Sequence, residues 1–82
     1  IEHPTGIGSA LLNQGNIALE GHSDPIGARS RYLEALKILL ESGPDTQIGL
    51  AYGNLAEATY FLHDPVEAVN SAQNAIRYFE RS

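Results

Sequence analysis

The sequence contains no cysteine, methionine or tryptophan and only 5 lysine and arginine residues. Without cysteine there is no disulfide framework, thiolate metal site or cysteine nucleophile, which fits a reducing cytoplasm. The 10 acidic residues bring the net charge to −5, and this balance argues against nucleic acid and anionic membranes as partners. No apolar run approaches the roughly 20 residues that cross a bilayer, and no segment resembles a signal peptide. We therefore expect a cytoplasmic protein.

The chain has the size and composition of one small globular domain. It has 82 residues, of which 43% are hydrophobic, and domains begin at about 50 residues. It starts at Ile1 rather than methionine, which favours a piece of a larger protein. We expect residues 1–82 to form a single domain.

Helix starts are the strongest local signals. Asp24-Pro25 and Asp64-Pro65 each place a capping carboxylate before a proline, whose missing N–H costs nothing in a first helical turn. Glu67 follows Asp64 by three residues and predicts a capping box. His3-Pro4-Thr5 is a weaker start.

A stop and a periodic apolar pattern complete the helix prediction. Gly43-Pro44-Asp45 predicts a helix end, with Gly43 in the left-handed conformation, followed by a new start. Two stripes have helical spacing: Ala28, Tyr32, Ala35, Leu36 and Leu39, and then Ala68, Ala72, Ala75, Ile76 and Phe79. We predict an all-α fold with helices at about 5–20, 25–42, 45–62 and 65–81.

The two helix pairs repeat one another. Residues from Asp24 onward align with those from Asp64 onward at an offset of 40, whereas the preceding helices align at an offset of 41. The extra residue is expected in the turn that contains His22, Ser23 and Asp24. Two antiparallel helix-turn-helix units, at about 5–42 and 45–81, therefore account for nearly the whole chain. The alternative is an ordinary four-helix bundle whose helices are alike by chance.

The residues of the two units resemble the tetratricopeptide repeat. The matching positions are Tyr52, Leu55, Ala56, Thr59, Ala68, Ala72 and Ala75 in the second unit, and Leu11, Gln14, Gly15, Ala18, Ala28, Tyr32 and Ala35 in the first. Gln14 departs from the usual leucine and Ala72 from the usual aromatic residue. The long period and the segment Ala51–Ala56 are similar to Leu-Gly-Asn repeat scaffolds, kinesin light chain and bacterial regulators. The resemblance implies a fragment of an α-solenoid.

The resemblance also implies a concave groove lined by the first helix of each unit. The residues it places there are Ser9, Leu12, Asn13, Asn16, Leu19, Glu20, Leu50, Gly53, Asn54, Glu57, Tyr60 and Phe61. At the equivalent positions Asn13 and Asn54, an amide both donates and accepts hydrogen bonds and so suits the backbone of an extended peptide. Alternatively, each asparagine caps, bonds within its helix or faces solvent, and Tyr60 and Phe61 belong to the core.

The charge distribution restricts the expected ligand. All the basic residues lie on second helices, and the groove holds Glu20 and Glu57. The family's carboxylate clamp is not supported, because Leu12 stands where its lysine should be. We expect a protein or peptide ligand that is neutral or basic and has apolar anchors.

The last helix suggests a second surface. Val69, Ile76 and Phe79 extend beyond its alanine stripe, whereas repeat arrays usually end in a polar capping helix. Either further repeats cover this face, or the chain pairs with itself as a homodimer.

An enzymatic function is not expected. His22 and His63 occupy turns without the three or four converging ligands that a metal needs, and no serine sits in a nucleophile motif. We expect no metal and no cofactor. The sequence predicts a non-catalytic protein-interaction module of an intracellular regulatory or signalling protein, with structural self-association as the alternative.

Overall fold

The computed structural model describes residues 4–82 and is helical almost throughout. Its elements are α1 (Pro4–Asn16), the π-helical turn η1 (Ile17–Gly21), α2 (Pro25–Ser42), α3 (Asp45–Phe61) and α4 (Pro65–Arg81). The predicted all-α fold is confirmed, and the predicted boundaries lie within a few residues of the observed ones. His3, part of the weaker predicted start, lies outside the described residues.

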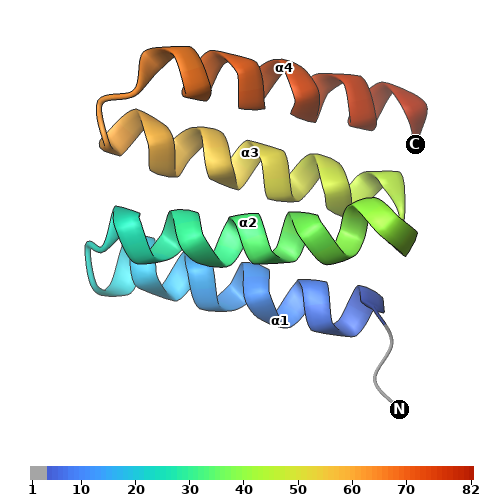
Figure 1. Cartoon of the computed structure of the whole chain (residues 1–82), viewed down its shortest axis with the longest axis horizontal. Helices are drawn as coiled ribbons and strands as arrows, with labels where there is room; N and C mark the ends of the chain where they lie inside the picture. Colours follow the sequence, from blue (N-terminus) through green and yellow to red (C-terminus); the bar gives the residue numbers. More distant parts are fainter. Residues whose placement is uncertain (1–3) are drawn as a thin grey trace.

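The α-helices lie side by side in chain order and alternate in direction (Figure 1). The α1–α2 and α3–α4 turns are at one end of the molecule, and the α2–α3 turn is at the other. Successive helices make the main contacts, and α1 also touches α3. There the Ser9 hydroxyl donates a hydrogen bond of 3.1 Å to Oε1 of Gln47. This arrangement brings one side of α1 next to one side of α3.

Both predicted aspartate caps are present. Asp24 accepts a hydrogen bond of 2.9 Å from the Gly27 N–H, and Asp64 accepts one of 3.1 Å from the Glu67 N–H. The predicted capping box is wrong, because the Glu67 carboxylate turns away from the Asp64 backbone and accepts from the Arg29 guanidinium, with N–O distances of 2.9 and 3.1 Å. A charged partner on α2 thus replaces the backbone donor.

The predicted left-handed conformation of Gly43 is also wrong. Its backbone is extended, with φ −85° and ψ 162°. The N–H of Gly43 donates to the Leu39 carbonyl over 2.6 Å, and an added Cβ would lie 2.9 Å from both the Cα and the carbonyl oxygen of Leu39. Glycine is needed here because the chain passes so close to the helix it has just left.

The left-handed residues are instead Ser23 and His63, with φ of 51° and 61°. His63 closes α3 in a Schellman motif, since its N–H donates to Tyr60 and the Asp64 N–H reaches the Thr59 carbonyl at 3.0 Å. In the first pair, the Asp24 N–H donates the equivalent bond of 2.8 Å to the Ala18 carbonyl. This bond reaches back six residues, whereas the bond from Asp64 to Thr59 reaches back five.

The difference of one residue between the helix pairs therefore lies in η1 and not in the turn. Ser23-Asp24-Pro25 and His63-Asp64-Pro65 have the same cap geometry, 40 residues apart. A π-helical turn closes i→i+5 bonds and holds one residue more than an α-helical turn. The extra residue is absorbed before the cap is reached.

Glycine allows the paired helices to approach closely. An added Cβ on Gly8 would lie 2.6 Å from Leu39 Cδ2, and one on Gly49 would lie 2.8 Å from the ring of Phe79. A Cβ on Gly15 would overlap the ring of Tyr32. The core comprises Leu12, Leu19, Ala28, Tyr32, Ala35, Leu36, Leu39, Ile48, Ala51, Leu55 and Ala58.

Candidate partner-binding surface

Exposed apolar side chains gather on α3. Leu50, Tyr60 and Phe61 have exposed fractions of 48%, 71% and 54%. The rings of Tyr60 and Phe61 meet edge to face with centroids 5.8 Å apart. These exposures exclude the alternative that the two aromatic residues belong to the core. Large exposed aromatic rings are frequent anchors of protein interfaces.

Hollows adjoin both rings. One of about 310 Å³ is lined by Leu19, Ser23, Pro25 and Phe61, and one of about 330 Å³ is lined by Tyr60, His63 and Pro65. The first joins the α1–α2 turn to the end of α3. We call the side of α1 and α3 that carries Asn13, Asn54, Glu57, Leu50, Tyr60 and Phe61 the α1–α3 face.

The three asparagines have different surroundings. Asn13 is exposed and Asn54 is half-buried, so a ligand can reach both. Asn16 accepts a hydrogen bond of 2.6 Å from the Tyr32 hydroxyl through Oδ1. This leaves the amide NH₂ group of Asn16 as the part that a ligand can use.

Leu12 does not lie on the α1–α3 face, and its assignment as a groove residue is wrong. Only 7% of it is exposed, and it belongs to the core with Leu19, which is 9% exposed. Gly8 and Gly15 bring α1 close to α2 on the same side of the helix. That close approach turns Leu12 inward.

The α1–α3 face is acidic. Burial, and then the charges of Glu57 and Glu20, raise the pKa of Tyr32 to about 12. Both carboxylates therefore act on the same hydroxyl, although they come from different helix pairs. No lysine or arginine occurs in α1, η1 or α3. The remaining acid of these helices, Asp45, lies 3.3 Å from Arg81 of α4.

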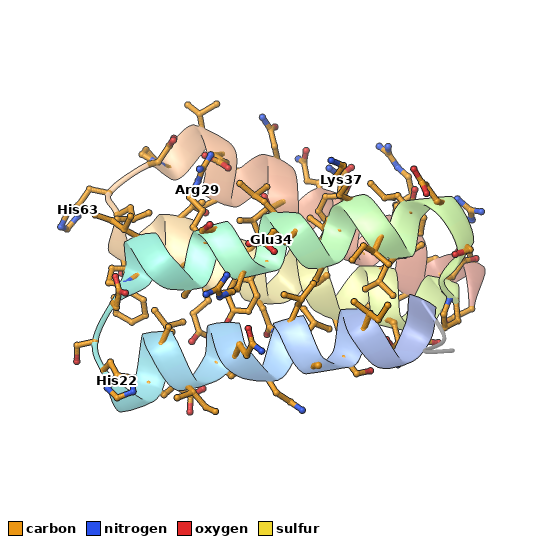
Figure 2. All side chains as sticks on the ribbon, turned by 60° about the horizontal axis from the view of Figure 1, so that its bottom comes forward. His22, Arg29, Glu34, Lys37 and His63 are labelled. Atoms are coloured by element: carbon orange, nitrogen blue, oxygen red, sulfur yellow. The ribbon has the colours of Figure 1, made fainter. Side chains whose placement is uncertain are left out.

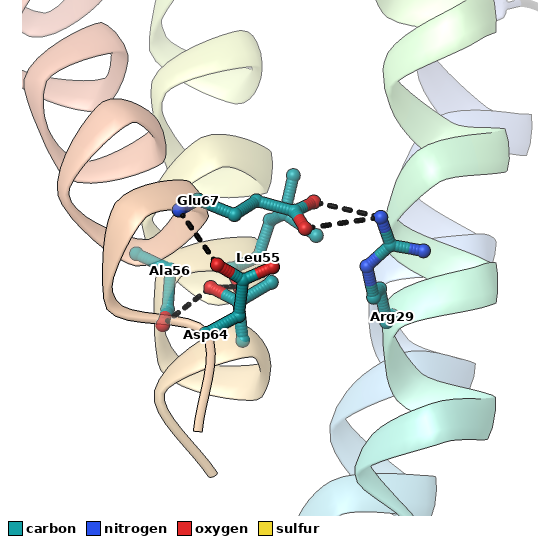
Figure 3. Close-up of polar contacts among 6 residues, drawn as sticks. Arg29, Leu55, Ala56, Asp64 and Glu67 are labelled. Atoms are coloured by element: carbon teal, nitrogen blue, oxygen red, sulfur yellow. Dashed lines mark hydrogen bonds and ion pairs between the residues drawn. The ribbon is translucent and has the colours of Figure 1, made fainter. Parts of the chain in front are cut away.

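A larger hollow lies elsewhere, between α2, α4 and the end of α3. Its volume is about 710 Å³, and its lining residues are Ile26, Arg29, Ser30, Leu33, Glu34, Lys37, Thr59, Leu62, Asp64 and Glu67. The Arg29–Glu67 ion pair joins α2 to α4 there (Figure 3). The sequence analysis did not find this feature, because these residues meet only through the packing of one helix pair on the next.

The histidines remain turn residues. His22 and His63 are exposed and lie on separate turns at the same end of the molecule (Figure 2). Within residues 4–82, no three or more histidine, cysteine, aspartate or glutamate side chains are placed to hold a metal ion. No helix of this part of the chain combines the length and apolar character needed to cross a membrane.

Comparison with known proteins yields no relative: no family model, no curated protein and no solved structure matches the chain.

Proposed function

We propose that this chain is a non-catalytic protein-interaction domain that binds a peptide or a partner helix across the α1–α3 face. The observation that carries the proposal is the pair Tyr60 and Phe61, exposed at 71% and 54% beside a hollow that Phe61 itself lines. Burying two such rings would remove a large apolar area from water, which is the main favourable term in most association.

The charges of the face favour a neutral or basic ligand with apolar anchors. Glu57 lies on it, Glu20 of η1 acts on the same Tyr32 hydroxyl as Glu57, and α1, η1 and α3 contain no basic residue. An acidic peptide would meet like charge, whereas lysine or arginine side chains would find carboxylates. The exposed Asn13 and half-buried Asn54 supply amides for a peptide backbone.

The resemblance to the tetratricopeptide repeat supports the same surface, because first helices line the ligand groove in that family. On this proposal the domain belongs to a cytoplasmic regulatory or signalling protein. Two helix pairs offer a small contact area, so modest affinity is expected unless several copies or sites act together.

The test is selection of a displayed random peptide library on this chain, followed by anisotropy measurements with the selected peptides. We expect apolar residues with lysine or arginine, and about tenfold or greater weakening by Phe61→Ser, the size of effect that loss of 1.4 kcal/mol gives. Asn13→Asp with Asn54→Asp should change the peptides selected.

Leu40→Ser is the matched control, since Leu40 is an exposed residue of α2 with 46% of its surface accessible. It should bind like the parent. Selection of mainly acidic peptides would contradict this proposal. An affinity that Phe61→Ser leaves unchanged would contradict it as well.

A second candidate function is self-association. Val69, Ile76 and Phe79 of α4 are exposed at 54%, 59% and 43%, and they lie along the helix at spacings of seven and three residues. An apolar stripe of this spacing is typical of a helix that packs against another helix.

A further inference from the structure

α4 leaves open the positions that α2 buries. Tyr32, Leu36 and Leu39 of α2 have at most 5% of their surface exposed. Their equivalents 40 residues later are Ala72, which is exposed, Ile76 at 59% and Phe79 at 43%. The cause is the order of the helices, since α2 lies between α1 and α3, whereas α4 packs mainly on α3 and, within residues 4–82, reaches α2 through the Arg29–Glu67 ion pair (Figure 1).

α1 leaves open, or only half-buried, the positions whose equivalents in α3 are buried in the core. Ile48, Ala51, Leu55 and Ala58 have at most 4% of their surface exposed. The positions 41 residues earlier are Ile7 and Ala10, then Gln14 and Ile17. Ile7 is half-buried, Ala10 and Gln14 are exposed, and Ile17 is 58% exposed.

The contact between α2 and α3 shows how the second helix of one pair packs against the first helix of the next. It joins the second helix of one pair to the first helix of the next, and the buried positions compared above belong to one continuous core. Tyr32 and Leu39 also contact α1, at Gly15 and Gly8. The open face of α4 corresponds to the face of α2 that packs in the core, because both are second helices of a pair. The open face of α1 corresponds to the buried face of α3, because both are first helices. One molecule therefore has two complementary open faces, one on α4 and one on α1, at opposite edges of the row of helices.

We propose that a second copy of this chain docks its α1 on α4, in the place that α3 occupies on α2. The two helices run antiparallel, as α2 and α3 do. Ile76 and the exposed part of Phe79, whose ring also contacts Gly49 of its own α3, then pack against Ile7 and Ala10. The amino-terminal half of α4 lies along Ile17. This inference gives a geometry to the self-association candidate and does not depend on peptide binding by the α1–α3 face.

Charge is compatible with this occupant. α1 contains no charged residue from Pro4 to Asn16, and the stripe Val69, Ala72, Ile76 and Phe79 is uncharged as well. Neither stripe therefore buries a charge of its own on docking, and an unpaired buried charge would oppose association. Because the contact uses two different faces, each docked copy leaves one of each free. The association is head to tail and adds copies in series.

The first experiment is sedimentation velocity of the full chain over a wide concentration range. The weight-average mass is expected to rise steadily with concentration, without stopping at a dimer. Ile17→Lys and Ile76→Lys each destroy one face at an exposed position, so both variants should fold, which circular dichroism checks. Each variant alone should be monomeric, with association weakened by at least about tenfold.

The decisive sample is an equimolar mixture of the two variants. The intact α4 of the Ile17→Lys chain should bind the intact α1 of the Ile76→Lys chain and give a one-to-one dimer that grows no further. Pairing of α4 with α4 would leave Ile17→Lys dimeric and the mixture without a mixed dimer. Either that pattern or a monomeric parent at the highest concentration overturns the proposal. Leu40→Lys is the control and should associate like the parent.

Discussion

The Tyr32 hydroxyl donates a hydrogen bond of 2.6 Å to Oδ1 of Asn16, while none of the Tyr32 residue is exposed. This bond joins α2 to the last residue of α1, beside the start of η1. The buried phenol of Tyr32 therefore lies close enough to Glu57 and Glu20 for their negative charges to raise its pKa.

Stability should fall at alkaline pH because of Tyr32. Its pKa is raised from 10.0 to about 12, by burial first and then by Glu57 and Glu20. The stabilising contribution is complete below pH 10. Above pH 10 the unfolded chain loses the phenolic proton first, so the free energy of unfolding falls toward pH 12 by up to about 1.4 kcal/mol per pH unit.

Urea unfolding between pH 9 and pH 11.5 measures this slope, over a window set by the shift of Tyr32 from 10.0 to about 12. Tyr32→Phe should cost about 1 kcal/mol at neutral pH and flatten the alkaline decline. Tyr60→Phe, at an exposed position, is the matched control and should keep the slope of the parent. An unchanged slope in Tyr32→Phe would assign the decline to other groups.

A methyl group at Gly15 should destabilise the fold. Its Cβ would overlap the ring of Tyr32, and overpacking of this kind costs about 1–3 kcal/mol. Gly53→Ala is the matched control, because no side chain and no atom of another helix lies within 4 Å of its added Cβ, apart from its two chain neighbours. That substitution should stabilise α3 by up to about 1 kcal/mol through helix propensity. Denaturant unfolding compares the two, and equal shifts would show that close helix contact at Gly15 is not required.

Glycine should be favoured at the left-handed turn residues. Ser23 has φ 51°, a conformation that costs a residue with a Cβ about 1 kcal/mol. Ser23→Gly should raise the free energy of unfolding by about 0.5 kcal/mol after the greater freedom of glycine in the unfolded chain is subtracted. Ser23→Ala also loses the hydroxyl but keeps the Cβ, and its melting temperature should not rise. A larger gain from alanine than from glycine would contradict this account.

The Arg29–Glu67 pair should couple the two helix pairs weakly. Its N–O distance is 2.9 Å, but the side chains are 39% and 28% exposed. A double-mutant cycle with Arg29→Met and Glu67→Gln should give a coupling energy of about 0.5–1 kcal/mol. The coupling should shrink as salt is added, since the charges reach solvent. A coupling that persists in high salt would indicate a stronger, packed interaction.

Local chemistry made the helices predictable. Asp24 and Asp64 cap helices through bonds within three residues, so the sequence contains the whole interaction. Gly15 occupies a small-residue position of the resemblance and does lie against Tyr32, whereas no sequence signal singled out Gly8, which lies against Leu39. Boundaries follow from such signals because they depend on few neighbours.

Rotation of a helix about its own axis was harder to predict. Leu12 lies inward because α1 packs on α2 through Gly8 and Gly15, and the resemblance placed it one position further round the helix. The Arg29–Glu67 pair depends on how one helix pair packs on the other. Such features arise from contacts between residues far apart in the chain, which no local pattern contains.

The π-helical turn at Ile17–Gly21 shows how this architecture tolerates a change in length. One residue is added in the wall of a helix, yet Ser23 and His63 keep the same left-handed conformation and Asp24 and Asp64 keep the same cap. The extra residue thus lies in the π-helical turn, before the left-handed residue and the Asp-Pro cap, and leaves their geometry unchanged. Further units of this kind should be sought by a left-handed residue followed by Asp-Pro, and not by a fixed number of residues between copies.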